Sequence, residues 1–339
     1  MEVRVAINGF GRIGRMVFRR MVSESDINIV AVNASYSPEQ LAHMLKYDSV
    51  HGKFEYPVEY TENSLIVNGK ETLLISERDA SKLPWSELGV EVVIEATGKF
   101  RSKEAASAHL LSGAKKVLIT APATNEDVTI VMGVNEEKYD YNQHHVISNA
   151  SCTTNCLAPF VKVLNDNFGI EYGMMTTIHS YTTDQKLLDN MHKDPRRARA
   201  AALSMIPTST GAARALSLVI PELAGRLNGL AIRVPTPDVS LVDLVVNVKE
   251  KVTIAEVNSV LKTSSEGALK GILGYTEEPL VSVDFVGDAH SSIIDGLSTM
   301  VIGDKQIKIL AWYDNEWGYS CRIVDVAKYI SKAYSDKRK

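Results

Sequence analysis

Residues Val3–Arg15 read VRVAINGFGRIGR, an apolar run that leads into three glycines at the spacing Gly-x-Gly-x-x-Gly. The run predicts a β-strand, and a helical pattern follows from about Arg12 to Met21. Only glycine lets such a turn form and lets backbone N–H groups approach a pyrophosphate, and the helix N-terminus adds partial positive charge. A plain turn between strand and helix is the alternative, but a second strand-like run at Ile27–Val32 favours a dinucleotide-binding βαβ unit.

The chain up to Ala150 continues to alternate between apolar runs and helical patterns, which is typical of a mostly parallel sheet covered on both faces. The further strands expected from these runs are Val90–Ala96, Lys116–Thr120, Thr129–Val134 and His145–Ala150. Asn68-Gly69 stands between two more apolar runs and predicts an inserted β-hairpin. We therefore expect an α/β fold whose first domain is of the Rossmann type.

The pattern changes after Ser151, where a long helix is expected from about Cys152 to Asn167. The strand-like runs that follow alternate in polarity, which indicates a mixed sheet with one exposed face. They are Gly173–Thr182, Leu230–Val234, Leu241–Val248 and Lys308–Tyr313. Because 339 residues are many for one core, we expect a dinucleotide-binding domain over 1–151 and an α+β catalytic domain over 152–315. An amphipathic helix over 316–336 is expected to pack back on the first domain.

The composition argues against several classes of protein. A net charge of -4 gives no electrostatic reason to expect a nucleic acid or an anionic membrane as a partner. No segment has the length and apolarity of a membrane span, and the first residues leave no room for an export signal, so we expect a cytoplasmic protein. The three cysteines fit a reducing compartment, and because no His/Cys group has zinc-ligand spacing we expect no metal.

The stretch Ser148–Cys156, SNASCTTNC, follows the last strand of the first domain and opens the long helix. A thiol at a helix start feels the helix dipole and nearby N–H groups, which favour the nucleophilic thiolate. Cys152 is therefore a candidate nucleophile, although a lone cysteine is more often a small buried hydrophobe, which is how we interpret Cys156. His179 ends an apolar run among polar residues and is a candidate base for the thiol, with a structural histidine as the alternative.

Taken together, these segments resemble the phosphorylating glyceraldehyde-3-phosphate dehydrogenases. The resemblance extends from about residue 3 to residue 330, and SNASCTTNC is highly specific to that family and its close relatives. The other matching segments are INGFGRIGR, KYDSVHGKF, PTSTGAA, RVPTPDVSLVDL, LKGILGYTEEPLVSVDF and WYDNEWGYS. The resemblance implies a reversible, phosphorylating oxidation of glyceraldehyde 3-phosphate to 1,3-bisphosphoglycerate, with hydride transfer to NAD(P).

The resemblance further implies that Cys152 attacks the aldehyde while His179 takes a proton, and that inorganic phosphate later cleaves the resulting thioester. Two anion sites are implied. The first contains Ser151, Thr153, Thr210 and Gly211, and the second contains Thr182, Arg197 and Arg233. From the residues alone, Arg197 would belong to a solvated basic face, whereas Arg233 inside the apolar run LAIRVPT indicates a buried anion or partner.

The residues implied to hold the cofactor are Asn8, Gly9, Gly11, Arg12, Ile13, Asn33, Arg78, Thr97, Thr120 and Asn315, the last at the nicotinamide amide. The resemblance implies that NAD-specific members of the family carry an aspartate in place of Asn33. The carboxylate of that aspartate binds the ribose hydroxyls and repels a 2′-phosphate. Asparagine removes that repulsion, and the run Asn33-Ala34-Ser35 resembles the NADP-preferring, gluconeogenic bacterial members. We therefore expect NADP in preference to NAD, with a neutral substitution in an NAD enzyme as the alternative.

Two other functions fit parts of the sequence. An erythrose-4-phosphate dehydrogenase would use the same thiol, but such enzymes tend to lose the Thr-Gly motif that PTSTGAA retains. A nucleotide- or RNA-binding protein would keep the fold without the chemistry, which the presence of Cys152 and His179 disfavours. The expected partners are thus a small-molecule substrate and inorganic phosphate. Because the family is typically tetrameric, we also expect a homotetramer with a subunit contact at Leu187–Ala202.

Overall fold

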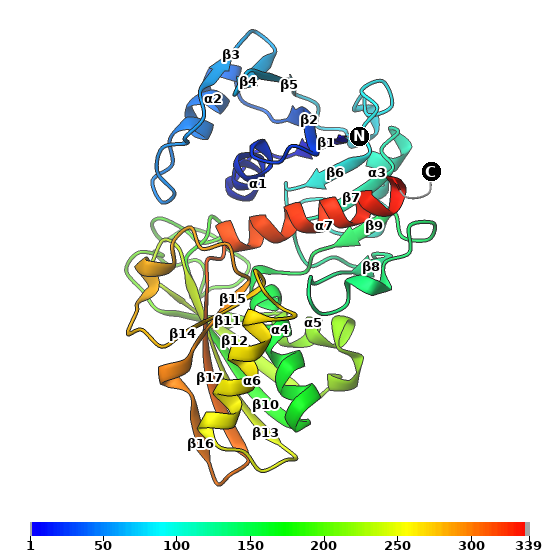
Figure 1. Cartoon of the computed structure of the whole chain (residues 1–339). Helices are drawn as coiled ribbons and strands as arrows, with labels where there is room; N and C mark the ends of the chain where they lie inside the picture. The colour runs from blue at the N-terminus through cyan, green and yellow to red at the C-terminus, as the bar shows by residue number, and fades with distance from the viewer. Residues whose placement is uncertain (1, 336–339) are drawn as a thin grey trace. The chain divides into compact units, whose positions relative to one another are not determined.

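The computed structural model describes residues 2–335, which form two compact units (Figure 1). The first unit contains the described residues up to Ile130, the segment Glu136–Ala150 and the chain from Ser320 onward. The second unit contains Val131–Asn135 and Ser151–Tyr319. Residue 1 and residue 336, where the last helix is expected to end, lie outside the described residues.

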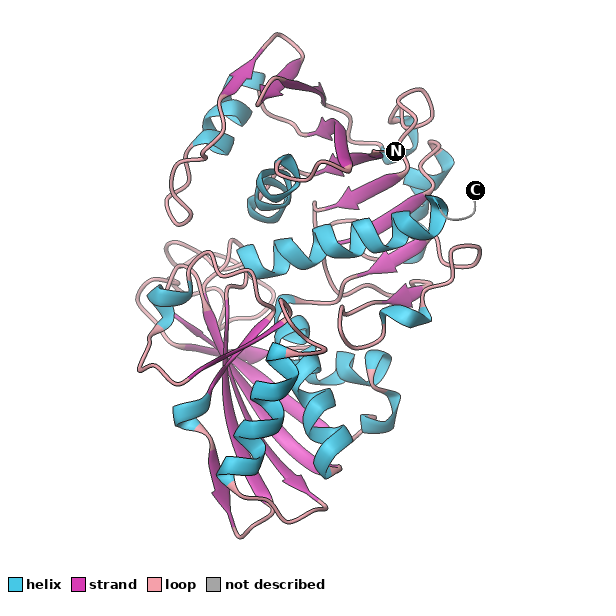
Figure 2. Cartoon of the chain, viewed as in Figure 1, coloured by secondary structure: helices cyan, strands magenta, loops and turns pink. Residues whose placement is uncertain are grey.

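A mostly parallel sheet forms the centre of the first unit, as the sequence predicts (Figure 2). Its strands lie in the order β3-β4-β5-β2-β1-β6-β7-β9-β8. The strands are β1 (Val3–Asn8), β2 (Ile27–Asn33), β3 (Val58–Tyr60), β4 (Ser64–Val67), β5 (Lys70–Ile75), β6 (Val92–Glu95), β7 (Lys116–Ile119), β8 (Val128–Thr129) and β9 (Val146–Ser148). Residues of β6, β7 and β9 are buried on both faces, which explains their continuous apolar runs.

The hairpin expected at Asn68-Gly69 is present as the antiparallel pair β4–β5, and both turn residues have positive φ, 51° and 75°. The helices that contribute to the first unit are α1 (Arg12–Val22), α2 (Pro38–Lys46), α3 (Lys103–Leu111) and, from Ser320 onward, α7 (Trp317–Ser335). The apolar stripe of α7 is buried at Ile323, Val326, Ala327 and Ile330, in agreement with the sequence pattern. Lys328 on the same helix lies 3.2 Å from the carboxylate of Asp26.

A mixed sheet forms the second unit, with strands in the order β11-β12-β10-β13-β17-β15-β14 and β16 paired with β17. The strands are β10 (Ile170–Ser180), β11 (Ile206–Ser209), β12 (Leu227–Val234), β13 (Ser240–Val248), β14 (Leu273–Thr276), β15 (Ser292–Asp295), β16 (Met300–Ile302) and β17 (Gln306–Tyr313). Buried and less buried residues alternate along β13 and β17, so one face of the sheet is the core face. The helices α4 (Cys152–Phe168), α5 (Ala212–Val219) and α6 (Ile254–Glu266) pack on this sheet.

Two differences from the sequence prediction have local causes. The strand expected over Thr129–Val134 ends at Thr129, because the Asn135 side chain accepts a hydrogen bond from the N–H of Val131 and turns the chain. The short strands β3, β11, β14, β15 and β16 were not expected, since three or four residues carry little periodicity. Single 3₁₀ turns occur at Ala80–Lys82, Glu136–Lys138, Pro221–Leu223, Ser282–Phe285 and Gly296–Ser298. Among residues 2–335, no helix combines the length and the apolar character needed to span a bilayer.

Candidate functional site

A strained turn precedes Cys152, the residue at which α4 begins. Between the end of β9 and this helix, Ala150 has a φ of 53°, a left-handed conformation that is uncommon for a residue with a side chain. Ser151 caps the helix, because its hydroxyl oxygen accepts a hydrogen bond from the N–H of Thr154 at 3.0 Å. Cys152 is therefore the first residue of a helix of 17 residues, where backbone N–H groups have no partner within the helix.

The structure brings Cys152 and His179 together, as the sequence predicts for a nucleophile and its base. The Sγ atom of Cys152 lies 3.5 Å from Nε2 of His179, which stands near the end of β10. His179 is buried and its ring meets the ring of Tyr313 edge to face at 6.0 Å. Cys152 is half-buried, whereas His179 is buried.

Burial acts on the pKa of both members of this pair. Burial raises the pKa of the Cys152 thiol, although the charge of Arg233 and the hydroxyl and N–H of Thr153 act in the opposite direction. Burial, followed by the charge of Arg233, lowers the pKa of His179 to about 3. Desolvation therefore opposes the thiolate that the helix start alone favours. The neutral imidazole is in the state that accepts a proton.

Arg233 contacts the far side of the His179 ring. Its Nη1 lies 2.6 Å from Nδ1 of His179 and donates to the carbonyl oxygen of Ser180 at 2.9 Å. The same Nδ1 lies 2.8 Å from that carbonyl oxygen. A neutral imidazole either donates from Nδ1 to the carbonyl or accepts there from the arginine, and only the first tautomer leaves Nε2 able to accept the thiol proton. If Nδ1 accepts from Arg233, Nε2 carries the hydrogen, and His179 is then a donor toward Cys152 and not a base.

Tyr313 at the end of β17 is a site residue that the sequence patterns did not indicate. Its hydroxyl lies 2.9 Å from Oγ1 of Thr153 and 2.8 Å from Oγ1 of Thr177. The Thr153 hydroxyl, expected to bind an anion, is therefore buried and already engaged inside the unit. The sequence signal for this role was a tyrosine at the end of an apolar strand run, because a buried phenol hydroxyl needs a hydrogen-bond partner.

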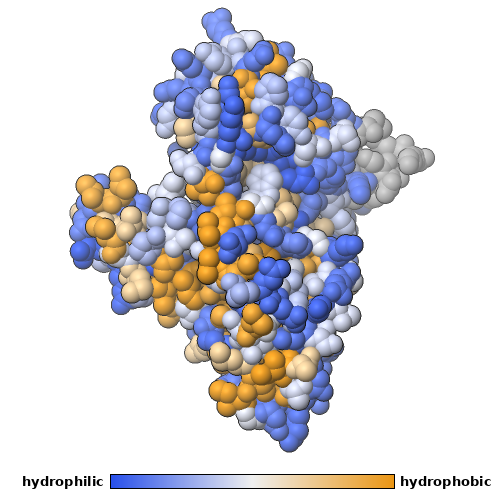
Figure 3. All heavy atoms as spheres, turned by 60° about the vertical axis from the view of Figure 1, so that its left-hand side comes forward, coloured by the Kyte–Doolittle hydropathy of each residue, from blue (hydrophilic) through white to orange (hydrophobic). Residues whose placement is uncertain are grey.

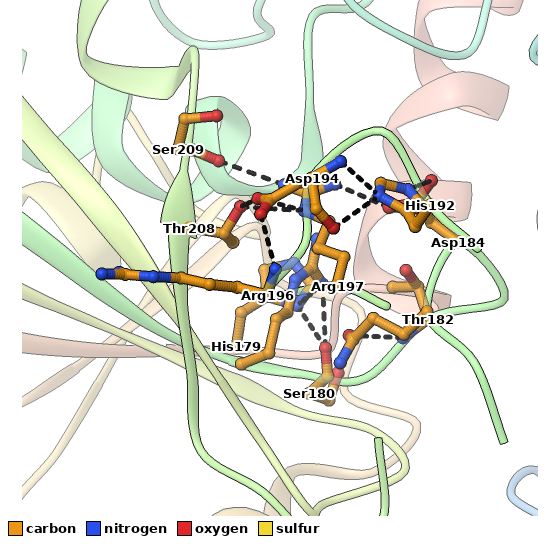
Figure 4. Close-up of polar contacts among 12 residues, drawn as sticks. His179, Ser180, Thr182, Asp184, His192, Asp194, Arg196, Arg197, Thr208 and Ser209 are labelled. Atoms are coloured by element: carbon orange, nitrogen blue, oxygen red, sulfur yellow. Dashed lines mark hydrogen bonds and ion pairs between the residues drawn. The ribbon is translucent and has the colours of Figure 1, made fainter. Parts of the chain in front are cut away.

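Arg197 lies within a polar cluster and not on a solvated face (Figure 4). Its guanidinium donates to Oδ2 of Asp184 at 2.6 Å, to Oγ1 of Thr208 at 2.9 Å and to the carbonyl oxygen of Ser209 at 3.2 Å. Burial alone would raise the pKa of Asp184, but the hydrogen bonds from Arg197 and His192 hold that pKa below its usual value. The charge of Arg197 also contributes to the lowered pKa of His179, so two guanidinium groups act on this histidine.

The remaining residues expected at the anion sites lie on turns. Thr182 is half-buried, and its N–H donates to the side chain of Gln185 at 3.3 Å. Thr210 and Gly211 lead into α5, where Oγ1 of Thr210 accepts from the N–H of Ala212 at 3.2 Å. A Cβ added to Gly211 would meet nothing within 4 Å. This turn therefore has open space beside a helix N-terminus, which suits an anion.

The glycine turn of the first unit fits a dinucleotide. Gly9 has a φ of 98°, and a Cβ at Gly14 would lie 2.1 Å from the carbonyl oxygen of Gly9, so the fold itself requires these two glycines. A Cβ at Gly11 would meet nothing within 4 Å, and this open space lies beside the first N–H groups of α1, those of Arg12 and Ile13. A phosphate placed there would meet donors that the helix leaves without partners.

Other expected cofactor residues surround the carboxyl ends of the parallel strands, the edge where such sheets bind ligands. Thr97 follows β6 and donates its N–H to the carboxylate of Glu95 at 2.8 Å, while the Thr120 hydroxyl donates to the carbonyl oxygen of Glu95 at 3.1 Å. The Arg12 guanidinium pairs with Asp48 at 2.5 Å. Although burial opposes it, the N–H of His51 and Arg12 hold the pKa of Asp48 at about 2. Arg12 thereby connects the loop after α2 to the start of α1.

The side chain of Asn33, expected at the cofactor ribose, makes hydrogen bonds within the first unit. Its side chain is 8% exposed, and its Nδ2 donates to Oδ1 of Asn8 at 2.7 Å and to the carbonyl oxygen of Glu77 at 2.7 Å. Its Oδ1 accepts from the N–H of Glu77 at 3.0 Å. Both amide hydrogens are used within the protein, so they are not available to a 2′-phosphate. Arg78, by contrast, is exposed directly after Glu77.

Asn8 extends this network into the core of the first unit. Its Nδ2 donates to the carboxylate of Glu95 at 2.6 Å and lies 3.3 Å from Nε2 of His109. Nδ1 of His109 in turn accepts from the indole N–H of Trp85 at 3.0 Å. All four of these side chains are buried. Sequence motifs did not indicate this network. They also did not indicate the contacts of Asn315 in the second unit, where its Oδ1 accepts from the hydroxyls of Ser180 at 2.7 Å and Ser240 at 2.6 Å.

A Rossmann unit with an open glycine turn and a second unit with a Cys–His pair define an oxidoreductase with a nicotinamide-binding fold. The family model "Glyceraldehyde 3-phosphate dehydrogenase, NAD binding domain" matches residues 3–103, and the model of the C-terminal domain matches residues 151–315. The chain therefore belongs to the glyceraldehyde-3-phosphate dehydrogenase family, as its similarity to individual proteins also shows.

Curated relatives are similar over almost their whole length. Glyceraldehyde-3-phosphate dehydrogenase 2 of Bacillus subtilis is 60% identical over 331 residues, which cover 98% of this chain and 97% of the relative. Glyceraldehyde-3-phosphate dehydrogenase of Geobacillus stearothermophilus is 62% identical over 331 residues, which cover 98% of this chain and 99% of the relative. Glyceraldehyde-3-phosphate dehydrogenase 2 of Trichormus variabilis is 56% identical over 335 residues, with coverage of 98% and 99%.

Proposed function

We propose that this protein catalyses the reversible, phosphorylating oxidation of glyceraldehyde 3-phosphate to 1,3-bisphosphoglycerate with NAD(P). The observation that carries the proposal is the Cys152 thiol at the start of α4, 3.5 Å from a neutral His179 and within the motif SNASCTTNC. The names of the relatives support the same substrate. In this proposal, residues 1–151 with the last helix form the cofactor domain and residues 152–315 the catalytic domain.

The proposed chemistry depends on proton transfer within the Cys–His pair. The Cys152 thiol attacks the aldehyde carbon and gives its proton to Nε2 of His179, so the thiolate forms only as the attack begins. The imidazolium then gives this proton to the oxygen anion of the thiohemiacetal. The neutral imidazole takes it back from the resulting hydroxyl as the hydride leaves. When bound, the cofactor accepts the hydride. Inorganic phosphate then attacks the thioester carbonyl, and the sulfur of Cys152 leaves.

We propose that the two arginines bind the substrate phosphate, while Ser151 and the turn at Thr210-Gly211 serve the attacking phosphate. Arg233 would have to turn from Nδ1 of His179 toward the bound anion. Nδ1 would then donate to the Ser180 carbonyl alone, which leaves Nε2 free to take the thiol proton. Binding of the anionic substrate would in this way favour the tautomer that the reaction needs.

We also propose that NADP is preferred over NAD, as in gluconeogenic bacterial members of the family. Asn33 itself carries no charge, and no acidic residue follows it in the sequence before Glu39, so the aspartate that the resemblance gives to NAD-specific members is missing. The exposed Arg78 is adjacent to Glu77, whose backbone binds Asn33, and its charge favours that phosphate. The preference therefore rests on the missing acid and on Arg78, since the amide hydrogens of Asn33 are engaged.

Initial rates of NADPH and NADH formation test these proposals. We expect turnover of glyceraldehyde 3-phosphate that requires inorganic phosphate, a higher kcat/KM with NADP, and no thioester-dependent activity in Cys152→Ser. Phosphate-independent turnover that prefers erythrose 4-phosphate would overturn the proposed substrate. A higher kcat/KM with NAD would overturn the cofactor preference alone.

We propose a homotetramer in solution. Large apolar side chains are exposed on the second unit, and Figure 3 shows hydrophobic side chains gathered on the surface. Those in and beside the expected subunit contact are 73% to 90% exposed; they are Leu187, Leu188, Met191, Leu203 and Met205. Such gathered apolar surface is typical of protein interfaces. Sedimentation at working concentration tests the assembly, and a monomer would refute it.

A further inference from the structure

Five residues of the second unit form a ring of hydrogen bonds that includes the Arg197 guanidinium (Figure 4). Arg197 donates from Nη1 to Oδ2 of Asp184 at 2.6 Å and from Nε to Oγ1 of Thr208 at 2.9 Å. The Thr208 hydroxyl donates to Oδ2 of Asp194 at 2.7 Å. His192 closes the ring, because its Nδ1 accepts from the N–H of Asp194 at 2.9 Å and its Nε2 lies 3.3 Å from Oδ1 of Asp184.

The chemistry of these groups fixes the direction of every hydrogen bond in the ring. A guanidinium only donates, so the Thr208 hydroxyl accepts from Arg197 and gives its single hydrogen to Asp194. Nδ1 of His192 accepts a backbone N–H, so the neutral imidazole carries its hydrogen on Nε2, the atom that faces Asp184. His192 is therefore a donor to the same carboxylate that binds Arg197.

The ring is attached to a strand on one side and to a loop on the other. Thr208 and Ser209 belong to β11, and Nη2 of Arg197 donates to the Ser209 carbonyl oxygen at 3.2 Å. Thr208 is buried, whereas the side chain of Asp184 is 48% exposed and lies in the segment that follows β10. An exposed side chain with one contact samples several rotamers, so the second contact, from His192, keeps the Asp184 carboxylate in one direction.

Arg197 keeps two hydrogens for an anion. A guanidinium has five N–H hydrogens, and three of them donate within the ring and to β11. The other two, one on Nη1 and one on Nη2, have no acceptor within residues 2–335. Burial lowers the pKa of Arg233, and the charge of Arg197 acts in the same direction, so the two guanidinium groups repel each other. A phosphate bound by both would relieve this repulsion.

We propose that His192 is a positioning residue, which acts through Asp184 to hold Arg197 in the direction that binds the phosphate of the substrate. This inference rests on the proposed function, because it presupposes an aldehyde substrate that carries a phosphate. Without the donor at His192, the exposed Asp184 would turn freely, and Arg197 would lose a fixed partner. The phosphate would then have to order the arginine on binding, which weakens its affinity.

Initial rates with glyceraldehyde 3-phosphate and with glyceraldehyde, at saturating cofactor and inorganic phosphate, test this inference. Glyceraldehyde lacks the phosphate, so the ratio of the two kcat/KM values reports on the site that binds the substrate phosphate. We expect His192→Leu to raise KM for glyceraldehyde 3-phosphate about fivefold with kcat within about twofold, so that the ratio falls about fivefold. His192→Gln keeps a donor and an acceptor, and its ratio should lie within about twofold of that of the unmodified protein.

His144→Leu is the matched control, because His144 is a half-buried histidine of the first unit whose Nδ1 also accepts a backbone N–H, that of Asp140 at 2.9 Å. It should change neither kcat/KM value. Thr208→Val breaks the ring at another point and should also lower the ratio, because Nε of Arg197 loses its acceptor. This variant carries the test if His192→Leu does not fold.

An unchanged ratio in folded His192→Leu, or in Thr208→Val where the first variant does not fold, would overturn the positioning role. An equal loss of kcat/KM with both aldehydes would show that His192 only supports the fold of its loop, and would also overturn it. A ratio in His192→Gln as low as that in His192→Leu would do the same, because the hydrogen bonds would not be what matters. If the unmodified protein oxidised neither aldehyde, the proposed function would be refuted instead.

Discussion

The two units contain buried polar networks built around an asparagine, and they use that residue in opposite ways. In the first unit, Asn33 directs both amide hydrogens and its oxygen to groups of the protein, at Asn8 and Glu77. In the second unit, Oδ1 of Asn315 accepts hydrogen bonds from two serine hydroxyls, and its Nδ2 donates to no group within residues 2–335. The first network is closed and the second is open.

This difference separates stabilisation from ligand binding. A closed network satisfies each of its groups internally, so the loss of one member leaves a buried donor or acceptor without a partner. An open network contains a group held in a fixed direction without an internal partner, which is the arrangement that binding and catalysis require. We assign Cys152 and His179 to the open kind, because a half-buried cysteine lies beside a buried histidine. We expect variants in the open kind of network to lose activity and variants in the closed kind to lose stability.

The largest effect is expected for His179→Gln, which removes the base but keeps a polar side chain of similar size. Turnover should fall by about 10³, within the range found for loss of a positioned base. Unfolding in urea should change little, because no buried charge is left behind. His145→Gln, at an exposed histidine of the first unit, is the control and should retain full turnover. A normal kcat in His179→Gln would contradict the open-network assignment.

Asn33→Asp probes the closed network and should destabilise the protein by about 2 kcal/mol. A carboxylate at this position would face the Glu77 carbonyl oxygen and Oδ1 of Asn8 with no hydrogen to donate. Asn315→Asp should cost less than about 1 kcal/mol, since both serines keep an acceptor. Urea denaturation of the two variants measures the difference. If Asn33→Asp were as stable as the unmodified protein, Asn33 would not be part of a closed network.

Acid should destabilise the protein partly through His179. Its pKa is about 3 in the folded chain, where burial and Arg233 disfavour the charged ring, and near 6.5 when unfolded. Between these values only the unfolded chain binds the proton, so stability falls as the pH drops below about 6.5. From pH 8 to pH 5.5 this histidine accounts for about 1.4 kcal/mol of lost stability. The loss should be smaller by that amount in His179→Gln, and an identical pH dependence in both proteins would rule out a buried neutral histidine.

The smallest effect is expected at the exposed Arg78, which lies next to the closed network without belonging to it. Arg78→Gln should lower the affinity for NADP relative to NAD by about fivefold, because an exposed charge contributes about 1 kcal/mol. The shift should shrink at high salt, where exposed charges are screened. Lys138→Gln, an exposed lysine of the same unit, is the matched control. An unchanged NADP to NAD ratio would leave the missing acid as the only support for the cofactor preference.

Much of the fold was predictable because its determinants are local. The glycine spacing of Gly9, Gly11 and Gly14, the turn at Asn68-Gly69 and a thiol at a helix start each lie within a few residues. Short-range sterics and hydrogen-bonding capacity decide such features, so one stretch of sequence is enough to indicate them. The Cys–His pair was also expected, and the structure brings the two residues to 3.5 Å although they are 27 positions apart.

Only the tertiary structure decided the state of the site residues. Asn33 lies in a closed network whose other members, Asn8 and Glu77, are 25 and 44 positions away in the sequence. The serines that donate to Asn315 are 135 and 75 positions away. Protonation at Cys152 likewise depends on burial by many segments, which outweighs the local effect of the helix start. The sequence by itself determined which chemical groups are present and which turns carry them. Their hydrogen-bond partners and their distance from water, which set protonation and direction, come from chain segments that only folding brings together.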